Sequence, residues 1–223
     1  MNEFKADTPF KFYTRLHLAE LTGYKASSLK ELLKILEKIS GSSIYHHTHR
    51  FLQQHQYLSP EPPNDFAYWV REHIGEEELG ERLSSIDTVQ FSSIRDLRNK
   101  IISTIKNYIK ENPKCLKKHS NPNQKFYFIK SLSFVLYTGY EAHNLNDFYE
   151  ILSKVTIDSI YYHIFESRLR LEKGMNDFSN WIENALNEKE LALQIEKLDP
   201  YTHTMEELRN TIIKIIKKRI KDD

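Results

Sequence analysis

The sequence has few of the residues that break a chain or cross-link it. Its 223 residues include 6 glycines, 7 prolines and a single cysteine, Cys115. Scarce glycine and proline favour helices over a loop-rich or all-β chain. A single cysteine excludes an intramolecular disulfide and a cysteine-based zinc site. We therefore expect a fold that depends on an ordinary hydrophobic core.

Neither one sign of charge nor long hydrophobic runs dominate the chain. The 32 lysines and arginines nearly balance the 31 aspartates and glutamates, and the net charge is +1. We therefore expect no nucleic-acid partner and no general attraction to an anionic membrane. No apolar run approaches the length of a membrane span, and the first residues have no signal-peptide core. These observations predict a cytoplasmic protein.

The usual catalytic signatures are also missing. There is no Gly-x-Ser-x-Gly motif, no glycine-rich phosphate loop and no His-Glu-x-x-His motif. Cys115 lies beside Lys114 and Lys117, whose charges could lower the pKa of its thiol, but no partner base is evident. The sequence therefore leans away from an enzyme.

What the sequence does contain is an internal repeat. Residues 21–51 align with residues 137–167 at a constant offset of 116, and 12 of these 31 positions are identical. A second block, residues 64–87, aligns with residues 176–199 at an offset of 112, with 8 of 24 positions identical. Internal repeats of this kind indicate that one supersecondary unit is used twice. Copy 1 carries four extra residues between the blocks, so the two copies differ most there.

The repeat and the helical periodicity together predict the fold class and the domains. We expect a mainly α, all-alpha type of protein with a duplicated helical module and pseudo-two-fold symmetry. Alternation in the segments near 10–22 and 126–138 leaves a small β element open, and their strand or helix character is undecided. Residues 1–110 are predicted to be copy 1, with a His-rich segment at 46–63, and residues 126–223 copy 2. The polar residues 111–125 are interpreted as a linker, and the two copies could pack as one globular unit.

Several segments of the chain are similar to a known family. HTHRFLQQHQYLSPEPPNDFAYWV in copy 1 and YYHIFESRLRLEKGMNDFSNWIE in copy 2 share a His…Asn-Asp-Phe-x-x-Trp core. They resemble an uncharacterised prokaryotic family of unknown function, over nearly the whole chain. The resemblance implies no activity, cofactor or catalytic residue. Because such modules recur attached to different domains, it implies a binding or regulatory role.

The His-rich part of copy 1 is the best candidate for a ligand site. Its residues 53–63 are polar, contain prolines and are unique to copy 1, and stiff loops on rigid scaffolds commonly carry binding. The predicted ligand-binding residues are His46, His49, Arg50, Gln53, Gln54, His55 and Tyr57. Their donors and aromatic face suit a small polar or anionic molecule, or a peptide. A bracing loop with no ligand is the structural alternative.

A divalent metal site is the alternative for the same segment. His46 and His49 are three residues apart, so they would project from one face of a helix. The remaining ligands would come from His55, Glu61 or Asp65. Copy 2 has Tyr162 and Phe165 at the positions of His46 and His49, so one chain would hold one metal.

Other residues that recur in both copies are interpreted as scaffold. A histidine that is kept while its neighbours diverge is expected to bond a backbone group in the core. The Asn-Asp-Phe-x-x-Trp motif is expected to cap a helix and to place aromatic side chains inward. The residues predicted to be structural are His47, His163, Asn64, Asp65, Trp69, Asn176, Asp177 and Trp181.

The leading functional prediction is a non-enzymatic binding or regulatory protein that acts through the copy 1 His/Gln/Pro segment. A metal-dependent enzyme using His46, His49 and His55 is the first alternative. A structural or assembly factor, including a homodimer, is the second. The identity of the ligand or protein partner is left open.

Overall fold

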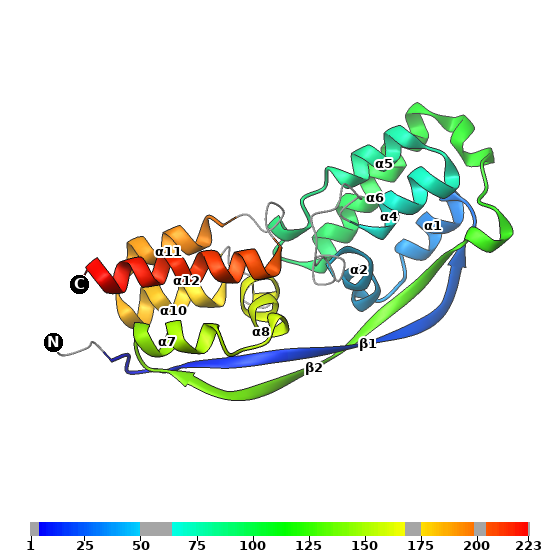
Figure 1. Cartoon of the computed structure of the whole chain (residues 1–223). Helices are drawn as coiled ribbons and strands as arrows, with labels where there is room; N and C mark the ends of the chain where they lie inside the picture. The colour runs from blue at the N-terminus through cyan, green and yellow to red at the C-terminus, as the bar shows by residue number, and fades with distance from the viewer. Residues whose placement is uncertain (1–4, 50–63, 168–174, 199–203, 223) are drawn as a thin grey trace. The chain divides into compact units, whose positions relative to one another are not determined.

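A computed structural model describes residues 5–49, 64–167, 175–198 and 204–222 (Figure 1). Within these residues the same order of elements occurs twice: a long strand is followed by short helices and then by a long last helix. The first series comprises β1 (Phe10–Ala26), α1 (Leu29–Leu36), α2 (Gly41–Thr48), α4 (Asp65–Trp69), the π-helix η1 (Val70–Ile74), α5 (Glu77–Ser84), the 3-10 helix η2 (Thr88–Gln90) and α6 (Ile94–Glu111).

Two short 3-10 helices follow α6, namely η3 (Pro113–Lys117) and η4 (Pro122–Gln124). The second series comprises β2 (Phe126–Ala142), α7 (Leu145–Leu152), α8 (Ile157–Tyr161), the π-helix η5 (Tyr162–Glu166), α10 (Asp177–Leu186), α11 (Lys189–Glu196) and α12 (Met205–Asp222). No helix among the described residues has the length and apolar character needed to cross a bilayer.

The predicted fold class is wrong. The chain is a mixed α/β protein and not a duplicated all-helical one, because β1 and β2 each run for 17 residues and pair with each other. Strict alternation of buried and exposed residues is confined to Phe10–Phe12 and Phe126–Phe128, while most central residues of both strands are exposed or half-buried. The period of two that reveals a strand in a sequence was therefore too weak to predict strands of this length.

The register of the strands is set by side chains that repeat in both halves. The Thr22 hydroxyl donates to the Phe128 carbonyl (2.7 Å), and the Thr138 hydroxyl donates to the Phe12 carbonyl (2.7 Å). Both pairs have the same sum of residue numbers, as antiparallel pairing requires. The glycines after these threonines, Gly23 and Gly139, have φ of +79° and +83°. Glycine adopts this left-handed conformation without the steric cost of a Cβ, which explains the Thr-Gly-Tyr sequence in both strands.

The chain forms two compact units that each contain parts of both strands. Unit 2 comprises the described residues of 17–54 and 59–132, and unit 1 comprises those of 1–16 and 133–223. Unit 2 therefore contains the first part of β2, although the helices that follow β2 belong to unit 1. Unit 1 likewise contains the first part of β1, although the helices that follow β1 belong to unit 2. The predicted copies, residues 1–110 and 126–223, were defined by sequence similarity. The compact units have other boundaries, which lie within β1 and β2.

In each unit, the strand that precedes the helices of the other unit is called the exchanged strand. In unit 2 the exchanged strand is β2, and it completes the core. Ser28 caps helix α1 by accepting a hydrogen bond from the Glu31 amide, and the helix buries Leu29, Leu32 and Leu36. These leucines belong to a hydrophobic cluster that includes Phe126 and Phe128 of β2. The remaining aromatic members of this cluster are Phe66, Trp69 and Tyr108. Phe66 stacks on Phe126 with ring centroids 5.1 Å apart.

Unit 1 uses β1 in the same way. Phe10 and Phe12 of β1 are buried, and both pack against Phe148 of α7 with ring centroids 5.4 and 5.3 Å apart. Phe178 and Trp181 of α10 also contact Phe10. Phenylalanine side chains contribute much to core stability, because burying each one removes a large apolar area from water.

We predict that residues 17–132 fold as an isolated fragment, whereas residues 1–110 do not. Every buried residue of the unit 2 core cluster lies between Ala26 and Phe128, so the first fragment retains the whole cluster. The second fragment lacks Phe126 and Phe128, and losing one buried Phe costs about 3–5 kcal/mol. Two such losses are comparable to a typical total stability of about 5–15 kcal/mol.

Thermal unfolding followed by circular dichroism would check this prediction, with the full chain as the reference. A cooperative transition of 1–110 equal to that of 17–132 would show that the exchanged strand is dispensable.

Candidate functional site

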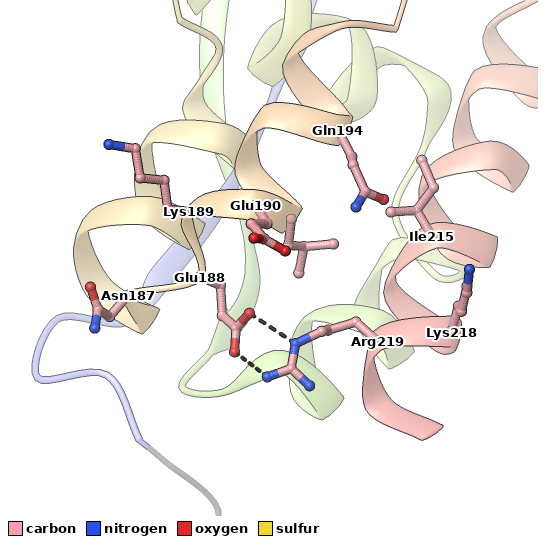
Figure 2. A pocket seen from close by; sticks show the side chains of 9 residues that line it. Asn187, Glu188, Lys189, Glu190, Gln194, Ile215, Lys218 and Arg219 are labelled. Carbon is pink, nitrogen blue, oxygen red and sulfur yellow. Dashed lines mark hydrogen bonds and ion pairs between the residues drawn. The ribbon is translucent and has the colours of Figure 1, made fainter. Parts of the chain in front are cut away.

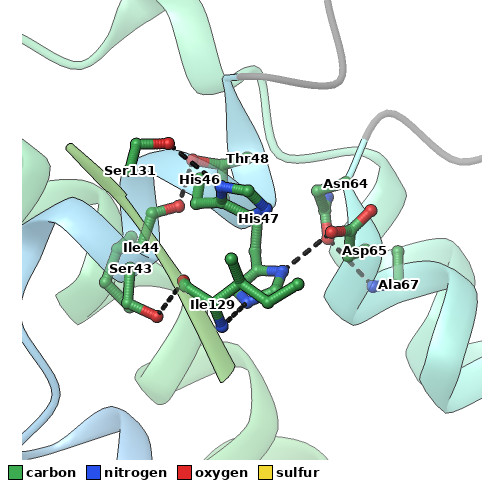
Figure 3. Close-up of polar contacts among 10 residues, drawn as sticks. All are labelled: Ser43, Ile44, His46, His47, Thr48, Asn64, Asp65, Ala67, Ile129 and Ser131. Carbon is green, nitrogen blue, oxygen red and sulfur yellow. Dashed lines mark hydrogen bonds and ion pairs between the residues drawn. The ribbon is translucent and has the colours of Figure 1, made fainter. Parts of the chain in front are cut away.

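Helix α2 carries the His-rich sequence in unit 2. Its residues Ile44, Tyr45, His47 and Thr48 are buried, and it ends at the cap residue His49. Successive residues of a helix point in directions about 100° apart. His46 and His47 therefore point in different directions, and Figure 3 shows them directed to different partners.

His47 connects a helix to the exchanged strand. Its Nε2 accepts a hydrogen bond from the Ile129 amide of β2 (3.0 Å), and its Nδ1 lies 2.7 Å from Oδ2 of Asp65 (Figure 3). Because Nε2 accepts from an N–H group, the proton of the neutral ring is assigned to Nδ1, which donates to the carboxylate. The ring is 3% exposed, so this bond satisfies a strand amide inside the protein.

Unit 1 contains the same arrangement. Nε2 of His163 accepts from the Tyr13 amide of β1 (2.8 Å), and Nδ1 lies 2.7 Å from Oδ2 of Asp177. A serine one turn before each histidine also bonds the carbonyl of the same strand residue, Ser43 to Ile129 and Ser159 to Tyr13 (2.7 Å each). Each unit thus binds both main-chain groups of one residue of the exchanged strand.

The Asn-Asp-Phe-x-x-Trp motif supplies the rest of this framework. Asn64 caps α4 by accepting from the Ala67 amide (2.9 Å), and Asn176 caps α10 by accepting from the Ser179 amide (2.8 Å). The aspartate that follows each asparagine orients the histidine described above. Each tryptophan donates its indole N–H to a carbonyl just before a strand, Trp69 to Gln124 (2.7 Å) and Trp181 to Thr8 (2.9 Å).

His46 and His49 have different environments from His47. His46 is half-buried, and its Nδ1 lies 3.0 Å from the Ser131 hydroxyl of β2. His49 is 1% exposed, and its Nδ1 lies 2.8 Å from the Thr48 hydroxyl. The His49 ring stacks on Tyr45 with an interplanar angle of 9° and ring centroids 5.3 Å apart.

The structure adds two residues that the sequence did not suggest. His17 of β1 stacks with Tyr45 (ring centroids 5.5 Å apart), and its Nε2 lies 3.4 Å from the Tyr45 hydroxyl. Ser131 of β2 reaches His46. Both residues lie on strands far from α2 in the sequence, so only the pairing of the strands could reveal them. Two groups thus lie at the end of α2, His46 with Ser131 and Tyr45 with His17 and His49, and they are called the imidazole cluster below.

The rest of the predicted site cannot be placed. Arg50, Gln53, Gln54, His55, Tyr57 and Glu61 lie outside the described residues. Among the residues that the structure does describe, no three His, Cys, Asp or Glu side chains come together as a metal site would require. Asp65, which was a candidate ligand, bonds His47 instead.

The equivalent positions in unit 1 carry other side chains. Tyr162 and Phe165 stand where His46 and His49 stand in the alignment, and they are 5% and 3% exposed. The next residue, Glu166, is fully buried and forms an ion pair with Arg15 of β1. The two units therefore share one backbone plan and differ in the chemistry at this point.

A separate hollow of about 510 Å³ lies in unit 1 between α11 and α12 (Figure 2). Glu188 and Arg219 form a two-bond ion pair in its wall, with distances of 3.0 and 2.8 Å. Lys189, Glu190 and Lys218 add charges of both signs. Because the central charges neutralise each other, the hollow offers no single sign of charge to a ligand.

Cys115 is buried, and its surroundings raise the pKa of its thiol. Burial raises the pKa of its thiol, and the nearby Glu76 carboxylate raises it further. The same carboxylate accepts from the Tyr108 hydroxyl, whose pKa is raised by burial and by this bond. The charge of Lys118, which pairs with Glu76 (3.0 Å), does lower the Cys115 pKa, but burial and the Glu76 carboxylate outweigh it.

We predict that the Asp–His pair of unit 1 contributes more stability than that of unit 2. The Asp177 side chain is 15% exposed and that of Asp65 is 46% exposed, so solvent screens the second pair more. Asp177→Ala should cost about 1–3 kcal/mol, the usual penalty for a buried partner left unsatisfied. Asp65→Ala should cost less than about 1 kcal/mol.

Amide hydrogen exchange measured by NMR would localise each effect. Asp177→Ala should speed exchange of the Tyr13 amide, and Asp65→Ala that of the Ile129 amide. Equal losses of stability in the two variants would contradict the screening argument.

Comparisons with known proteins agree with the fold and bring no activity. The sequence model of DUF5752, a family of unknown function, matches residues 7–217. A solved structure, OrfY from Thermoproteus tenax, is similar with a TM-score of 0.81 and 24% identity, over 96% of this chain and 97% of that chain. This likeness shows the fold alone. No curated protein matches the chain.

Proposed function

The chain belongs to DUF5752, and we propose that it is a non-enzymatic binding or regulatory protein for a small polar or anionic ligand. The site residues are the set predicted from the sequence, His46, His49, Arg50, Gln53, Gln54, His55 and Tyr57, of which His46 and His49 lie in the imidazole cluster. A protein partner at the same place is an outcome that the test below distinguishes.

One observation carries the proposal: the fold itself does not need histidines at these positions. Unit 1 builds the same part of the structure with Tyr162 and Phe165, and both side chains are buried. Thr48 is also replaced there, by Ile164. Unit 1 thus provides a natural control that shows which residues suffice for packing.

Replacing buried apolar groups by imidazoles has an energetic cost. Burying a polar group without full compensation costs about 1–3 kcal/mol on the scale of protein mutations. Residues that cost stability and are not required by the fold are characteristic of functional sites. The buried ring of His49 is one that the fold does not require, because its unit 1 equivalent is Phe165.

The Asp–His pairs do not support a catalytic role, although they resemble the Asp–His part of a catalytic triad. A general base needs a ring nitrogen that can accept the proton of a substrate or nucleophile. In His47 and His163 that nitrogen, Nε2, accepts a main-chain N–H of the exchanged strand. These histidines therefore act as connectors between helix and strand.

The repeated contacts also support a common origin of the two halves. The bonds made by His47, Ser43 and Trp69 recur at His163, Ser159 and Trp181 with equivalent partners. We propose that the chain arose by duplication of one module and that unit 2 acquired the ligand site after the copies diverged.

The double variant His46→Tyr plus His49→Phe tests the functional proposal, because it gives unit 2 the side chains of unit 1. We expect it to remain folded, with an unchanged or higher melting temperature, and to lose ligand binding. Binding would be measured as thermal shifts with phosphate monoesters, carboxylates, nucleotides and polyols, followed by calorimetry. A ligand at 100 times its Kd should stabilise the wild type by about 2.7 kcal/mol.

The matched control is His119→Tyr, which makes a similar change at an exposed position of unit 2. Unchanged ligand affinity in the double variant would refute the site. Loss of folding in the double variant would show that the histidines are structural. Retention of a lysate protein by the wild type alone, with no small-molecule shift, would identify a protein partner instead.

A further inference from the structure

The hollow of unit 1 is lined by two residues that have exact counterparts in unit 2. Asn187 and Glu188 align with Gly75 and Glu76 at the offset of 112. Asn187 and Gly75 both have the left-handed backbone conformation, with φ of +58° and +69°. The glutamate that follows each of them is the N-cap residue of a helix, α11 or α5. The two units therefore present an equivalent main-chain carbonyl and an equivalent carboxylate at this point.

In unit 2 these two acceptors bind a lysine ammonium. Nζ of Lys118, which follows η3, donates to the Gly75 carbonyl (2.6 Å) and lies 3.0 Å from Oε1 of Glu76. Oε2 of the same carboxylate accepts from the Tyr108 hydroxyl of α6. The Glu76 side chain is only 10% exposed, and a carboxylate with so little solvent needs such partners. The carbonyl and the carboxylate thus form an ammonium site that the chain itself fills.

In unit 1 the same acceptors face the hollow. Two bonds from Arg219 of α12 hold the Glu188 carboxylate in place, as Figure 2 shows, and the Glu188 side chain is 26% exposed. Within the part of the chain that the structure describes, no lysine bonds Glu188 or the Asn187 carbonyl. A carboxylate has about four acceptor positions, so the two bonds from Arg219 leave room for an ammonium.

The other lining residues determine which kind of amine fits. The hollow of about 510 Å³ has the size of a small-molecule site, which is about 300–1,000 Å³. Its lining has three basic and two acidic side chains, so a ligand with one sign of charge would meet repulsion as well as attraction. Lys218, next to Arg219 on α12, is exposed and can donate to a carboxylate. Leu191 and Ile215 add apolar surface.

We infer that the hollow of unit 1 binds a small zwitterion of the amino acid class. Its ammonium lies on the Glu188 carboxylate and the Asn187 carbonyl, as the ammonium of Lys118 does on their counterparts in unit 2. Its carboxylate lies at Lys218. This site belongs to unit 1 and is independent of the one proposed for unit 2.

NMR titration of the full chain tests the site with probes of defined charge. The zwitterions are glycine, L-leucine and 4-aminobutyrate, and ethylammonium and acetate each carry one of the two charges. We expect at least one zwitterion to shift the Glu188 and Lys189 amide signals in a saturable way. Its affinity should exceed that of either singly charged probe by about 10-fold or more, because it makes one more charge-assisted bond. The Gly75 and Glu76 amides should not respond, because Lys118 fills their site.

Two variants separate the two ends of the ligand. Glu188→Gln removes the charge that holds the ammonium and should abolish the response to zwitterions and to ethylammonium. Lys218→Ala changes an exposed residue, so the chain should stay folded. It should weaken the zwitterion by about 10-fold and leave ethylammonium unchanged. The matched control is Glu150→Gln, which alters an exposed carboxylate of α7 and should bind zwitterions as the wild type does.

Opening the filled site of unit 2 gives a second test that does not need a stable Glu188 variant. Lys118→Ala removes the ammonium from the Gly75 carbonyl and the Glu76 carboxylate. We expect ethylammonium to raise the melting temperature of this variant more than that of the wild type. Lys117→Ala, which changes the exposed lysine one position earlier, is the control for general salt effects.

The outcomes separate this inference from the function proposed for unit 2. Equal affinities for zwitterions and ethylammonium would overturn the zwitterion as the ligand class. No saturable shift of the Glu188 and Lys189 amides with any probe would overturn the site. Equal stabilisation of Lys118→Ala and Lys117→Ala by ethylammonium would overturn the ammonium position. Each readout concerns residues outside the imidazole cluster, so a failure here leaves the unit 2 proposal standing on its own test.

Discussion

The hydrogen bond from a strand amide to a buried histidine is the interaction on which each unit depends. The Ile129 amide bonds His47 and the Tyr13 amide bonds His163, and each ring is oriented by an aspartate at the start of a helix. A buried amide without a partner would cost about 1–3 kcal/mol, so the histidine secures the strand on its helices. The nearby phenylalanines, Phe126 and Phe128 in unit 2 and Phe10 and Phe12 in unit 1, then have a defined place in the core.

Each unit contains part of the strand that precedes the helices of the other unit. Unit 2 begins within β1 and ends within β2. Unit 1 comprises residues from both ends of the chain. Two units with the same order of elements can carry different polar side chains at one position. The contrast between buried Glu166 in unit 1 and the imidazole cluster in unit 2 follows this logic, and it is why the unit 1 side chains serve as controls for unit 2.

Much of the candidate site was accessible from the sequence, because its pattern is local. His46 and His49 were recognised by their helical spacing and by their replacement in copy 2. The caps Asn64 and Asn176 were recognised by the motif that follows them, and both bonds are present. The strand residues His17 and Ser131 were missed, since nothing in their neighbourhood points to α2. The fold class was wrong for a related reason: a two-stranded pair with exposed central residues has little alternation.

The sequence by itself determined which residues match between the halves, where the helices are capped and which side chains distinguish copy 1 from copy 2. Those properties depend on neighbours within a few positions, and the residues can be compared directly. Only the tertiary structure decided which strand each histidine holds, and therefore where one folding unit ends and the other begins. The bonds concerned join residues 82 and 150 positions apart. Contacts between such distant residues form only when the whole chain packs, so patterns among neighbouring residues do not predict them.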